Sequence, residues 1–378
     1  MRDGTTNIAL PSQWPEKLRQ VWKVQVGEGH SSPVVSGNRV FQFSRQGDNE
    51  VAAAYDLASG KQVWKDEYPA PYRMNIAAHA HGKGPKSTSV VADGRLFTLG
   101  ISGILSAYDS QSGKMIWRKA FKSEYKSTSP DFGTAASPLV DGKQLIAFVG
   151  GDQGGALTAF DTATGAVKWA WNGEGPAYAS PIVVEIDGKR HVITNSEKQL
   201  VSVSAADGGL LWSLPLKTPY TQNAVTPLWV NGLIVYSGLD NPATGLKVKW
   251  AGKWDVEKAW ETKEASMYMS SPVPRDAVVY GFTNRNKGQL FALDAASGKV
   301  VWTGAPRQGD NASLIAAGQM VLVLTTEANL LVYRVAKPGL ELLRQYKVSD
   351  TDTWAYPALT PEGILVKDKE SLALWSAR

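Results

Sequence analysis

Cysteine is absent from the 378 residues of this chain, and histidine occurs only four times. The first absence excludes disulfides, thiolate metal ligands and cysteine nucleophiles, and the second leaves little for multi-histidine metal sites. Long apolar runs are also missing, because Gly, Asp, Lys or Ser interrupts each of them, so no transmembrane segment is predicted. The net charge of +5 is spread along the chain without a block of Lys or Arg. Nucleic acid is therefore not an expected partner.

Tryptophan and glycine are abundant, with 14 and 36 copies, and they belong to a repeated phrase. The phrase Asp-x-x-(Ser/Thr)-Gly-x-x-x-Trp ends at Trp64, Trp117, Trp169 and Trp302, and a degenerate form ends at Trp212. A second phrase, Ser-Pro followed by apolar residues, recurs with its variants and raises the number of repeats to eight. The interval of roughly 40 to 55 residues is typical of repeat architectures.

Each repeat has the pattern of short antiparallel strands. Apolar and polar residues alternate with a period of two, as in 95–99 and 105–108, and Asp-Gly or Asn-Gly turns separate the stretches. In the longer phrase the Asp can accept bonds from nearby N–H groups, while the Gly supplies a positive φ. No helical period is sustained. The sequence therefore predicts an all-β, eight-bladed β-propeller of four-stranded antiparallel blades.

The two ends of the chain predict how the propeller closes. A strand at 20–25 precedes the first repeat, and the last repeat, which begins near Trp354, has room for only three strands. We expect the N-terminal strand to complete this last blade, which removes an exposed sheet edge. Residues 20–378 then form a single propeller domain and 1–19 an N-terminal tail. The first residues have no apolar region typical of a signal peptide.

On these residues the chain resembles the family with quinoprotein-type, or PQQ-like, propeller repeats, over about residues 20–378. The motif of that family is Ala-x-Asp-x-x-Thr-Gly-x-x-x-Trp, in which each Trp docks between neighbouring blades. The resemblance implies this docking role for Trp22, Trp64, Trp117, Trp169, Trp212 and Trp302. Trp260 keeps the Trp without the phrase, and Leu343 is expected in place of the Trp in the seventh repeat.

The family contains secreted PQQ-dependent alcohol dehydrogenases, a branch resembling BamB, and uncharacterised envelope proteins. The dehydrogenases are longer, with insertions for calcium ligands and a catalytic Asp, and hold the quinone with a vicinal disulfide that this chain lacks. Length and blade count resemble the BamB-like branch. The resemblance implies a non-catalytic, monomeric scaffold, periplasmic or extracellular, which binds protein partners of the cell envelope and needs no cofactor. The alternative is a PQQ-dependent dehydrogenase with PQQ and calcium in the central channel.

Partner binding is expected on one face of the blades. The turns that join strands A to B and C to D are short, whereas the B–C and D–A connections are predicted to be long and irregular. The connections expected on this second face, the long-loop face, are 45–50, 69–85, 122–133, 150–155, 217–223, 238–245 and 283–288. Loops on a rigid scaffold usually carry binding. The candidate anchors are Tyr72, Arg73, Tyr125 and Tyr220.

A second candidate site lies at the mouth of the channel. Register places one residue of each repeat there, three positions before the Ser-Pro proline or its equivalent: His30, Lys86, Ala135, Tyr178, Ala224, Met269, Asn311 and Trp354. The candidate ligand-binding residues are His30, Arg45, Lys86, Tyr178 and Trp354, since basic groups attract a carboxylate or phosphate. Ordered water in the channel and solvated loop charges are the alternatives. No catalytic or metal-ligating residue is predicted, because His79 and His81 make only half a metal site and no Gly-x-Ser-x-Gly motif occurs.

Overall fold

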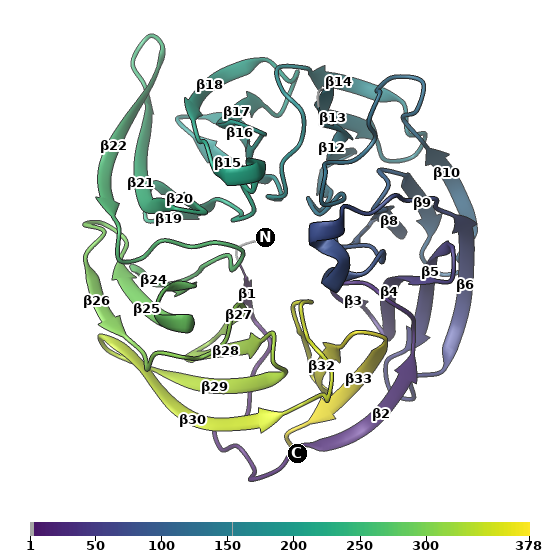
Figure 1. Cartoon of the computed structure of the whole chain (residues 1–378), viewed down its shortest axis with the longest axis vertical. Coiled ribbons are helices and arrows are strands. Elements are labelled where there is room, and N and C mark those ends of the chain that lie inside the picture. Colours follow the sequence, from purple (N-terminus) through teal and green to yellow (C-terminus); the bar gives the residue numbers. More distant parts are fainter. Residues whose placement is uncertain (1–3, 153) are drawn as a thin grey trace. The chain divides into compact units, whose positions relative to one another are not determined.

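Eight β-sheets make up the protein, which the computed structural model describes over residues 4–152 and 154–378. Seven sheets have four strands and one has five, and consecutive strands form antiparallel hairpins (Figure 1). Helical structure in the described residues is limited to three short 3-10 segments, η1 (Ile76–His81), η2 (Pro219–Thr221) and η3 (Arg285–Lys287). The predicted all-β, eight-bladed β-propeller is therefore confirmed.

The chain divides into two compact units of four blades each, and the first comprises Arg19–Pro181 with Ala355–Ser376. It holds blades one, two, three and eight. In order from strand A to strand D, these are β3 (Val34–Ser36), β4 (Arg39–Gln46), β5 (Asn49–Asp56) and β6 (Gln62–Pro69); β7 (Val90–Ala92), β8 (Arg95–Leu99), β9 (Leu105–Asp109) and β10 (Met115–Lys119); β11 (Leu139–Asp141), β12 (Gln144–Gly151), β13 (Gly154–Asp161) and β14 (Val167–Trp171); β31 (Ala358–Thr360), β32 (Gly363–Lys367), β33 (Ser371–Ser376) and β2 (Arg19–Gln25).

The second unit comprises the residues up to Leu18 together with Ile182–Trp354 and holds blades four to seven. Its strands are β15 (Ile182–Ile186), β16 (Lys189–Asn195), β17 (Gln199–Ser204) and β18 (Leu210–Pro215); β19 (Leu228–Val230), β20 (Leu233–Gly238), β21 (Asn241–Trp250) and β22 (Trp254–Thr262); β23 (Val273–Arg275), β24 (Val278–Thr283), β25 (Gln289–Asp294) and β26 (Val300–Thr303); β27 (Ala312–Ala317), β28 (Met320–Thr325), β29 (Asn329–Ala336) and β30 (Gly339–Lys347). Blade seven also carries β1 (Thr5–Thr6).

The N-terminal strand closes blade eight, as predicted. β2 pairs antiparallel with β33, with Trp22 opposite Leu374 and Lys23 opposite Ala373. The residues before β2, which were predicted to form a tail, make specific contacts with blade seven. β1 pairs in parallel with β27, the Tyr346 hydroxyl donates to Pro15 O at 2.5 Å, and the Trp14 ring lies 6.2 Å from that of Tyr346. Residues 5–15 are thereby held along blade seven.

The Asp-x-x-(Ser/Thr)-Gly phrase forms the turn between strands C and D, as its composition indicates. In blade two, Asp109 Oδ1 accepts from Ser112 N at 2.8 Å and from Ser112 Oγ at 2.7 Å. Gly113 has a φ of 75°, and a Cβ there would lie 2.5 Å from the Trp64 ring. Glycine is therefore required for two reasons, the positive φ and the close approach of the indole.

Each of several tryptophans contacts this turn in the next blade. Trp64 Nε1 donates to Ser110 O at 3.0 Å, and Trp117 Nε1 donates to Thr162 O at 3.2 Å. The same bond is made by Trp22 to Leu57 O at 2.9 Å and by Trp260 to Ala295 O at 3.0 Å. Of the six tryptophans that carry the resemblance, Trp22, Trp64, Trp117, Trp169 and Trp212 are buried and Trp302 is half-buried.

Blade five departs from the repeated turn. Its strands β21 and β22 continue past the length of other blades into a hairpin that ends at Trp250 and Trp254 (Figure 1). The repeated turn that accepts from the Trp in other blades is missing there, and the buried Trp212 Nε1 has no hydrogen-bond partner among the described residues. The C–D turn of blade five, 251–253, is short as predicted, but it follows a longer hairpin than the turns of the repeated phrase.

Strand pairing corrects two further expectations. The B–C connection of blade one is a two-residue turn, 47–48, with Gly47 at a φ of 59°, and that of blade five is also two residues, 239–240. Long B–C loops at 45–50, 150–155 and 238–245 were therefore wrong, because the strands continue almost to the turn, as where Gly151 pairs with Gly154. In blade seven Arg344, not Leu343, stands at the Trp position, since Val332 pairs with Arg344 as Ala54 pairs with Trp64.

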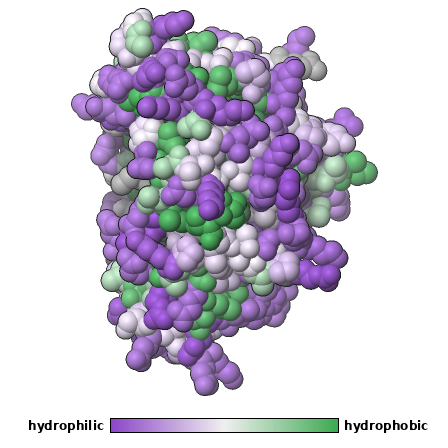
Figure 2. Space-filling model, turned by 90° about the vertical axis from the view of Figure 1, so that its left-hand side faces the viewer, coloured by the Kyte–Doolittle hydropathy of each residue, from purple (hydrophilic) through white to green (hydrophobic). Residues whose placement is uncertain are grey.

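Apolar side chains are mostly enclosed between successive blades of a unit, as where Phe97 and Leu105 of blade two pack with Leu145 and Phe160 of blade three. The surface drawn in Figure 2 is largely hydrophilic, with separate hydrophobic patches. The exposed large hydrophobic residues are Val63, Ile76, Met115, Ile116, Val167, Leu210, Tyr220, Trp250 and Leu342. In the described part of the chain, no helix has the length and apolar character needed to cross a bilayer.

Candidate functional site

The longest connection of the first unit joins strand D of blade one to strand A of blade two, residues 70–89, and it contains η1. Asn75 precedes this helical segment, and its side-chain oxygen accepts from Ala77 N at 2.8 Å. The amide nitrogen of the same side chain donates to Asp131 Oδ2 at 2.6 Å. The connections that follow blades one and two are thereby joined, so the long-loop face of this unit has a defined structure.

The predicted anchor residues differ in exposure. Arg73 is exposed, and Tyr220, which lies in η2 of the second unit, is 79% exposed. Tyr72 is half-buried with an enclosed hydroxyl, and a Cβ on Gly133 would lie 3.0 Å from that oxygen. Tyr125 is half-buried and packs against the apolar cluster of blades two and three. Arg73 and Tyr220 are thus the anchors that a partner can reach most directly.

Arg45, at the end of β4, is only 4% exposed and is surrounded by carbonyl groups. Its Nε donates to Gly47 O at 2.9 Å, its Nη1 to Ala70 O at 3.0 Å and its Nη2 to Asp48 O at 3.2 Å. The guanidinium therefore holds the B–C turn against the start of the connection 70–89. With its donors turned to the backbone, Arg45 positions this loop rather than presenting a free fork to a ligand.

Lys86 and Tyr178 meet around the backbone of Phe132. Lys86 Nζ donates to Phe132 O at 2.7 Å, and Phe132 N donates to the Tyr178 hydroxyl at 3.3 Å. The Phe132 and Tyr178 rings lie 6.1 Å apart. Burial lowers the pKa of Lys86 to about 8 and raises that of Tyr178. Two of the predicted ligand-binding residues are therefore brought together in the structure, on either side of the loop at 131–134.

His30 lies beside His81 of η1, with the two rings edge to face at 5.8 Å. Its backbone N donates to Pro85 O at 2.8 Å, which ties blade one to the connection 70–89. Burial lowers the pKa of His30 to about 3, and the nearby positive charges of His81, Lys86 and Lys367 act in the same direction. The imidazole of His30 is therefore neutral at physiological pH.

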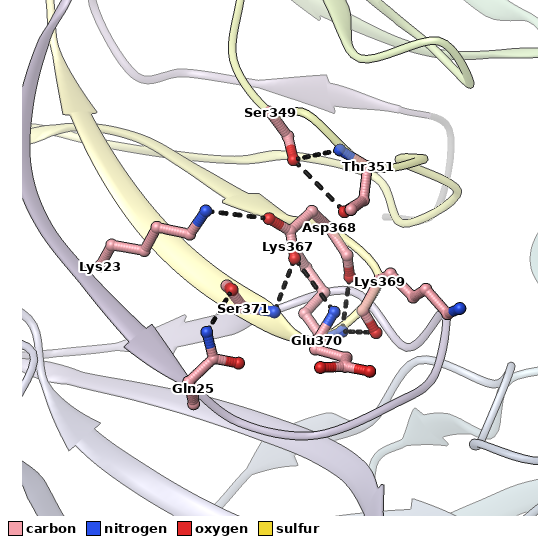
Figure 3. A network of polar contacts seen from close by, with 9 residues as sticks. All are labelled: Lys23, Gln25, Ser349, Thr351, Lys367, Asp368, Lys369, Glu370 and Ser371. Atoms are coloured by element: carbon pink, nitrogen blue, oxygen red, sulfur yellow. Dashed lines mark hydrogen bonds and ion pairs between the residues drawn. The ribbon is translucent and has the colours of Figure 1, made fainter.

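Lys367 is a buried cation that the sequence analysis missed. It is 1% exposed, and its Nζ donates to Asp368 O at 2.6 Å and to Lys369 O at 3.0 Å (Figure 3). A third bond goes to Gly29 O at 3.2 Å. Burial lowers its pKa to about 8. Strand pairing places Lys367 where blade one has Phe43 and blade two has Leu99. A lysine at a position that is apolar in other repeats was the available clue.

Beside Lys367, Asp368 organises the B–C turn of blade eight (Figure 3). Its Oδ1 accepts from Ser371 N at 2.6 Å and from Glu370 N at 3.0 Å, and its Oδ2 lies 3.4 Å from Lys23 Nζ. This ion pair joins two strands of blade eight that lie far apart in the sequence, because Lys23 belongs to β2 and Asp368 follows β32. This turn fixes the carbonyls that surround the buried ammonium.

A buried carboxyl group, also missed, lies one strand away from Arg45. Glu50 on β5 is fully buried and accepts from the Tyr68 hydroxyl at 2.8 Å and from Ile101 N at 2.6 Å. Burial raises its pKa. The residue that it approaches, Gly100, has no room for a side chain, since a Cβ would lie 1.9 Å from Glu50 Oε2. These contacts join blades one and two and leave the carboxyl group enclosed.

Near the long-loop face, the first unit holds the buried Arg45 and Lys367 and the half-buried Lys86 and His30. The three cations donate mostly to backbone carbonyl oxygens, so they bind loop backbone in this structure. Trp354 belongs to the second unit and is half-buried. Across residues 4–152 and 154–378, no three His, Asp or Glu side chains are grouped so that they could hold a metal ion.

Comparison with known proteins gives the following matches. The family model described as outer membrane protein assembly factor BamB matches residues 15–83, 47–304 and 253–346. The outer membrane protein assembly factor BamB of Yersinia pestis is 28% identical over 228 residues, 57% of this chain and 54% of that protein. The quinate/shikimate dehydrogenase (quinone) of Acinetobacter baylyi is 21% identical over 347 residues, 75% of this chain and 40% of that protein.

Among solved structures, BamB from Moraxella catarrhalis superposes with a TM-score of 0.68 at 13% identity, covering 95% of this chain and 97% of the other. At this identity the superposition supports the fold alone. The chain spans about half the length of the curated relatives that it matches.

Proposed function

This chain belongs to the family described as outer membrane protein assembly factor BamB, and on that premise we propose that it is a non-catalytic scaffold of the cell envelope, periplasmic or extracellular. In this proposal it acts as a monomer and binds protein partners of outer-membrane assembly through the long-loop face of its blades. The observation that carries the proposal is the family match, whose three segments together cover residues 15–346.

The construction of the long-loop face supports this role. The connection 70–89 is held by Arg45, by the Asn75 bond to Asp131 and by the His30 bond to Pro85. Its exposed residues, among them Arg73 and the 89% exposed Ile76, are therefore presented by a backbone that is already ordered. Preorganised loops lose less conformational entropy on binding, which favours a recognition surface.

The test is a capture experiment with matched charge reversals in blade one. Purified wild-type protein, the variant Arg73→Glu and the variant Lys61→Glu are immobilised and exposed to envelope extract from the source cells. Both replaced residues are exposed, but Lys61 lies in the C–D turn, at the opposite end of the blade. We expect Arg73→Glu to lose outer-membrane assembly proteins that wild type and Lys61→Glu retain. The same proteins captured equally by all three variants, or captured by none, would refute the long-loop face as the binding surface.

The quinone-dependent alternative is supported by the similarity to the quinate/shikimate dehydrogenase, and the residues of this chain fit it poorly. Calcium prefers six to eight oxygen ligands, and the described residues offer no grouped carboxylates. Lys86 can attract an anionic group, but it does not supply the calcium site. A titration with PQQ and calcium, followed by tryptophan fluorescence, tests this alternative. We expect no saturable quenching, and micromolar quenching with dye reduction on adding alcohols or sugars would reverse the ranking.

A further inference from the structure

A pocket of about 470 Å³ opens between the outer strands of blades six and seven, within the second unit. Its floor consists of Trp302, Leu331, Tyr333 and Leu340, which are buried or half-buried. Leu342, at the rim, is 48% exposed. The volume lies in the range of about 300–1,000 Å³ that ligand sites usually have.

The pocket lies where blade six lacks a buried apolar side chain that several other blades supply after the Trp. In four other blades the residue four positions after the Trp is apolar and buried; these residues are Val26, Tyr68, Phe121 and Leu216. Phe121, for example, lies 5.9 Å from Phe160 of the next blade. β26 ends at Thr303, and the corresponding residue, Pro306, is exposed. Tyr333 stands at the register of Phe160 and has no such neighbour, so it lines a cavity instead.

Side-chain amides complete the lining. Gln308 donates to the Tyr333 hydroxyl at 3.0 Å and accepts from Leu290 N at 2.9 Å, which fixes its position. Asn329 and Gln345 also line the pocket, and Gln345 Nε2 donates to Asn329 Oδ1 at 3.4 Å. Among the described residues that line the pocket, Arg307 alone carries a charge, and it is exposed at the edge. Such a lining suits an uncharged apolar group with amides beside it, and it disfavours a buried charge.

The position of the pocket favours a polypeptide as the occupant. It is bounded by the D–A connection 304–308 and by Asn329 after the B–C turn, so it opens at the long-loop end of these blades. β30 is the last strand of its sheet, and within the described residues no strand pairs with its outer edge. An unpaired edge offers backbone donors and acceptors to an extended chain.

We infer that this pocket receives an uncharged apolar side chain from an extended segment of a partner protein. In this arrangement Trp302, Leu331, Tyr333 and Leu340 enclose the side chain, and the amides of Gln308, Asn329 and Gln345 face the adjacent peptide groups. The inference rests on the proposed function, because it names one anchoring site for a partner on the long-loop face.

The test measures binding of single-residue probes to the purified full chain by saturation-transfer NMR titration. The probes are N-acetyl-phenylalaninamide and N-acetyl-leucinamide, compared with N-acetyl-glutamate amide, N-acetyl-lysinamide and N-acetylglucosamine. The variant is Leu342→Glu, which adds a carboxylate to the rim. The control is Leu210→Glu, because Leu210 is 53% exposed and stands at the same register in strand D of blade four. Thermal melting confirms that both variants are folded.

We expect saturable binding of the two apolar probes at millimolar concentration. Leu342→Glu should weaken it about tenfold, the cost of placing a charge beside an apolar group, and Leu210→Glu should leave it unchanged. Equal binding of the charged probes, preference for the sugar, no saturable binding, or equal effects of the two variants would each overturn the inference. This titration uses no partner protein. A negative result would therefore overturn the inference about the pocket, and the capture experiment with Arg73→Glu would still test the proposed function independently.

Discussion

Blades two and six have a tryptophan at the same position of strand D, but the packing around the two indole rings differs. Trp117 is 9% exposed, its Nε1 donates to Thr162 O at 3.2 Å, and Phe121 covers the space beyond it. Trp302 stands at the same register, yet it is half-buried and lines an open pocket. The difference lies in the residue four positions after the Trp, which is the buried Phe121 in blade two and the exposed Pro306 in blade six.

This comparison separates residues that serve the fold from residues that create a site. A residue that recurs at the same place in many blades, such as the Gly of the C–D turn, provides a backbone conformation or a contact that these blades share. Where one blade departs from the repeat, a side chain is lost or added, and only the packing around that side chain changes. Functional hypotheses are therefore better drawn from the departures, among them Lys367 and the exposed Pro306.

The largest expected effect is the loss of stability when a tryptophan in a closely packed region is replaced. Trp117→Ala should lower the free energy of unfolding by about 3–5 kcal/mol, because a buried aromatic leaves a cavity and the carbonyl of Thr162 loses its donor. Trp302→Ala should cost about half as much, since its ring already borders open space. Denaturant unfolding of the two variants gives the comparison, and equal losses would show that the two blades are packed alike.

The second comparison concerns charge, because the first unit holds the buried Lys367 and the half-buried Lys86, whereas the only charged residue among the described lining of the pocket in the second unit is the exposed Arg307. Both lysines have a folded pKa of about 8, below the ordinary value of 10.5. Between these values the unfolded chain binds more protons than the folded one, so stability should rise with pH from about 8 to 10. The gain should be on the order of 2 kcal/mol, discounted from the full shift.

The lysine prediction is checked by unfolding the wild type and Lys367→Met across this pH range. Tyrosines whose pKa is raised by burial, such as Tyr68, act in the opposite direction above pH 10, which sets the upper limit of the window. We expect the variant to show a smaller rise than wild type. A stability that falls steadily from pH 8 to 10 in wild type would contradict the proposed burial of the two ammonium groups.

A third experiment asks what fills the space after the Trp in blade one, where Tyr68 occupies the position of Phe121. Its hydroxyl donates to the buried Glu50, so Tyr68→Phe keeps the ring and removes one bond. We expect a loss of about 1–2 kcal/mol, the cost of leaving a buried acceptor less satisfied, and a further rise in the pKa of Glu50. Denaturant unfolding of this variant beside Phe121→Leu measures it. No loss would indicate that apolar filling alone matters here.

Much of the fold could be predicted from the sequence, because the residues of the repeated phrases interact within one turn or with the neighbouring blade. Asp109, Gly113 and Trp64 each act within one turn and its neighbour, and their spacing is visible in the chain. The closing role of β2 followed from counting strands. The Trp position of blade seven could not be predicted in the same way, because Val332 pairs with a residue 12 positions later whereas Ala54 of blade one pairs with a residue 10 positions later, and this longer hairpin moves the position to Arg344.

The candidate site was less predictable, because it depends on burial and on strand ends. Arg45 was expected to bind a ligand at the mouth of the channel, but in the structure its guanidinium donates to the backbone carbonyls of Gly47 and Ala70. The partners of Lys367 are backbone carbonyls, which no side-chain pattern reveals. The pocket beside Trp302 required knowing that Pro306 is exposed and does not pack where Phe121 packs in blade two, and a Gly-Ala-Pro sequence after a strand does not by itself reveal this.

The smallest expected effect concerns the turn that receives a tryptophan. Asp109 shapes the turn whose Ser110 O accepts from Trp64, and its hydrogen bonds to Ser112 hold its pKa below the ordinary value. Asp109→Ala should lower Tm slightly, while Asp109→Asn should keep most of the stability because the amide oxygen can still accept. The contribution of the carboxylate is present above its unfolded pKa of about 3.9 and lost as pH falls through the lower folded value. Melting curves at pH 7 and pH 3 should therefore show the difference between wild type and Asp109→Ala shrinking in acid. An unchanged Tm for Asp109→Ala at pH 7 would mean that the glycine and the indole hold the turn without the carboxylate.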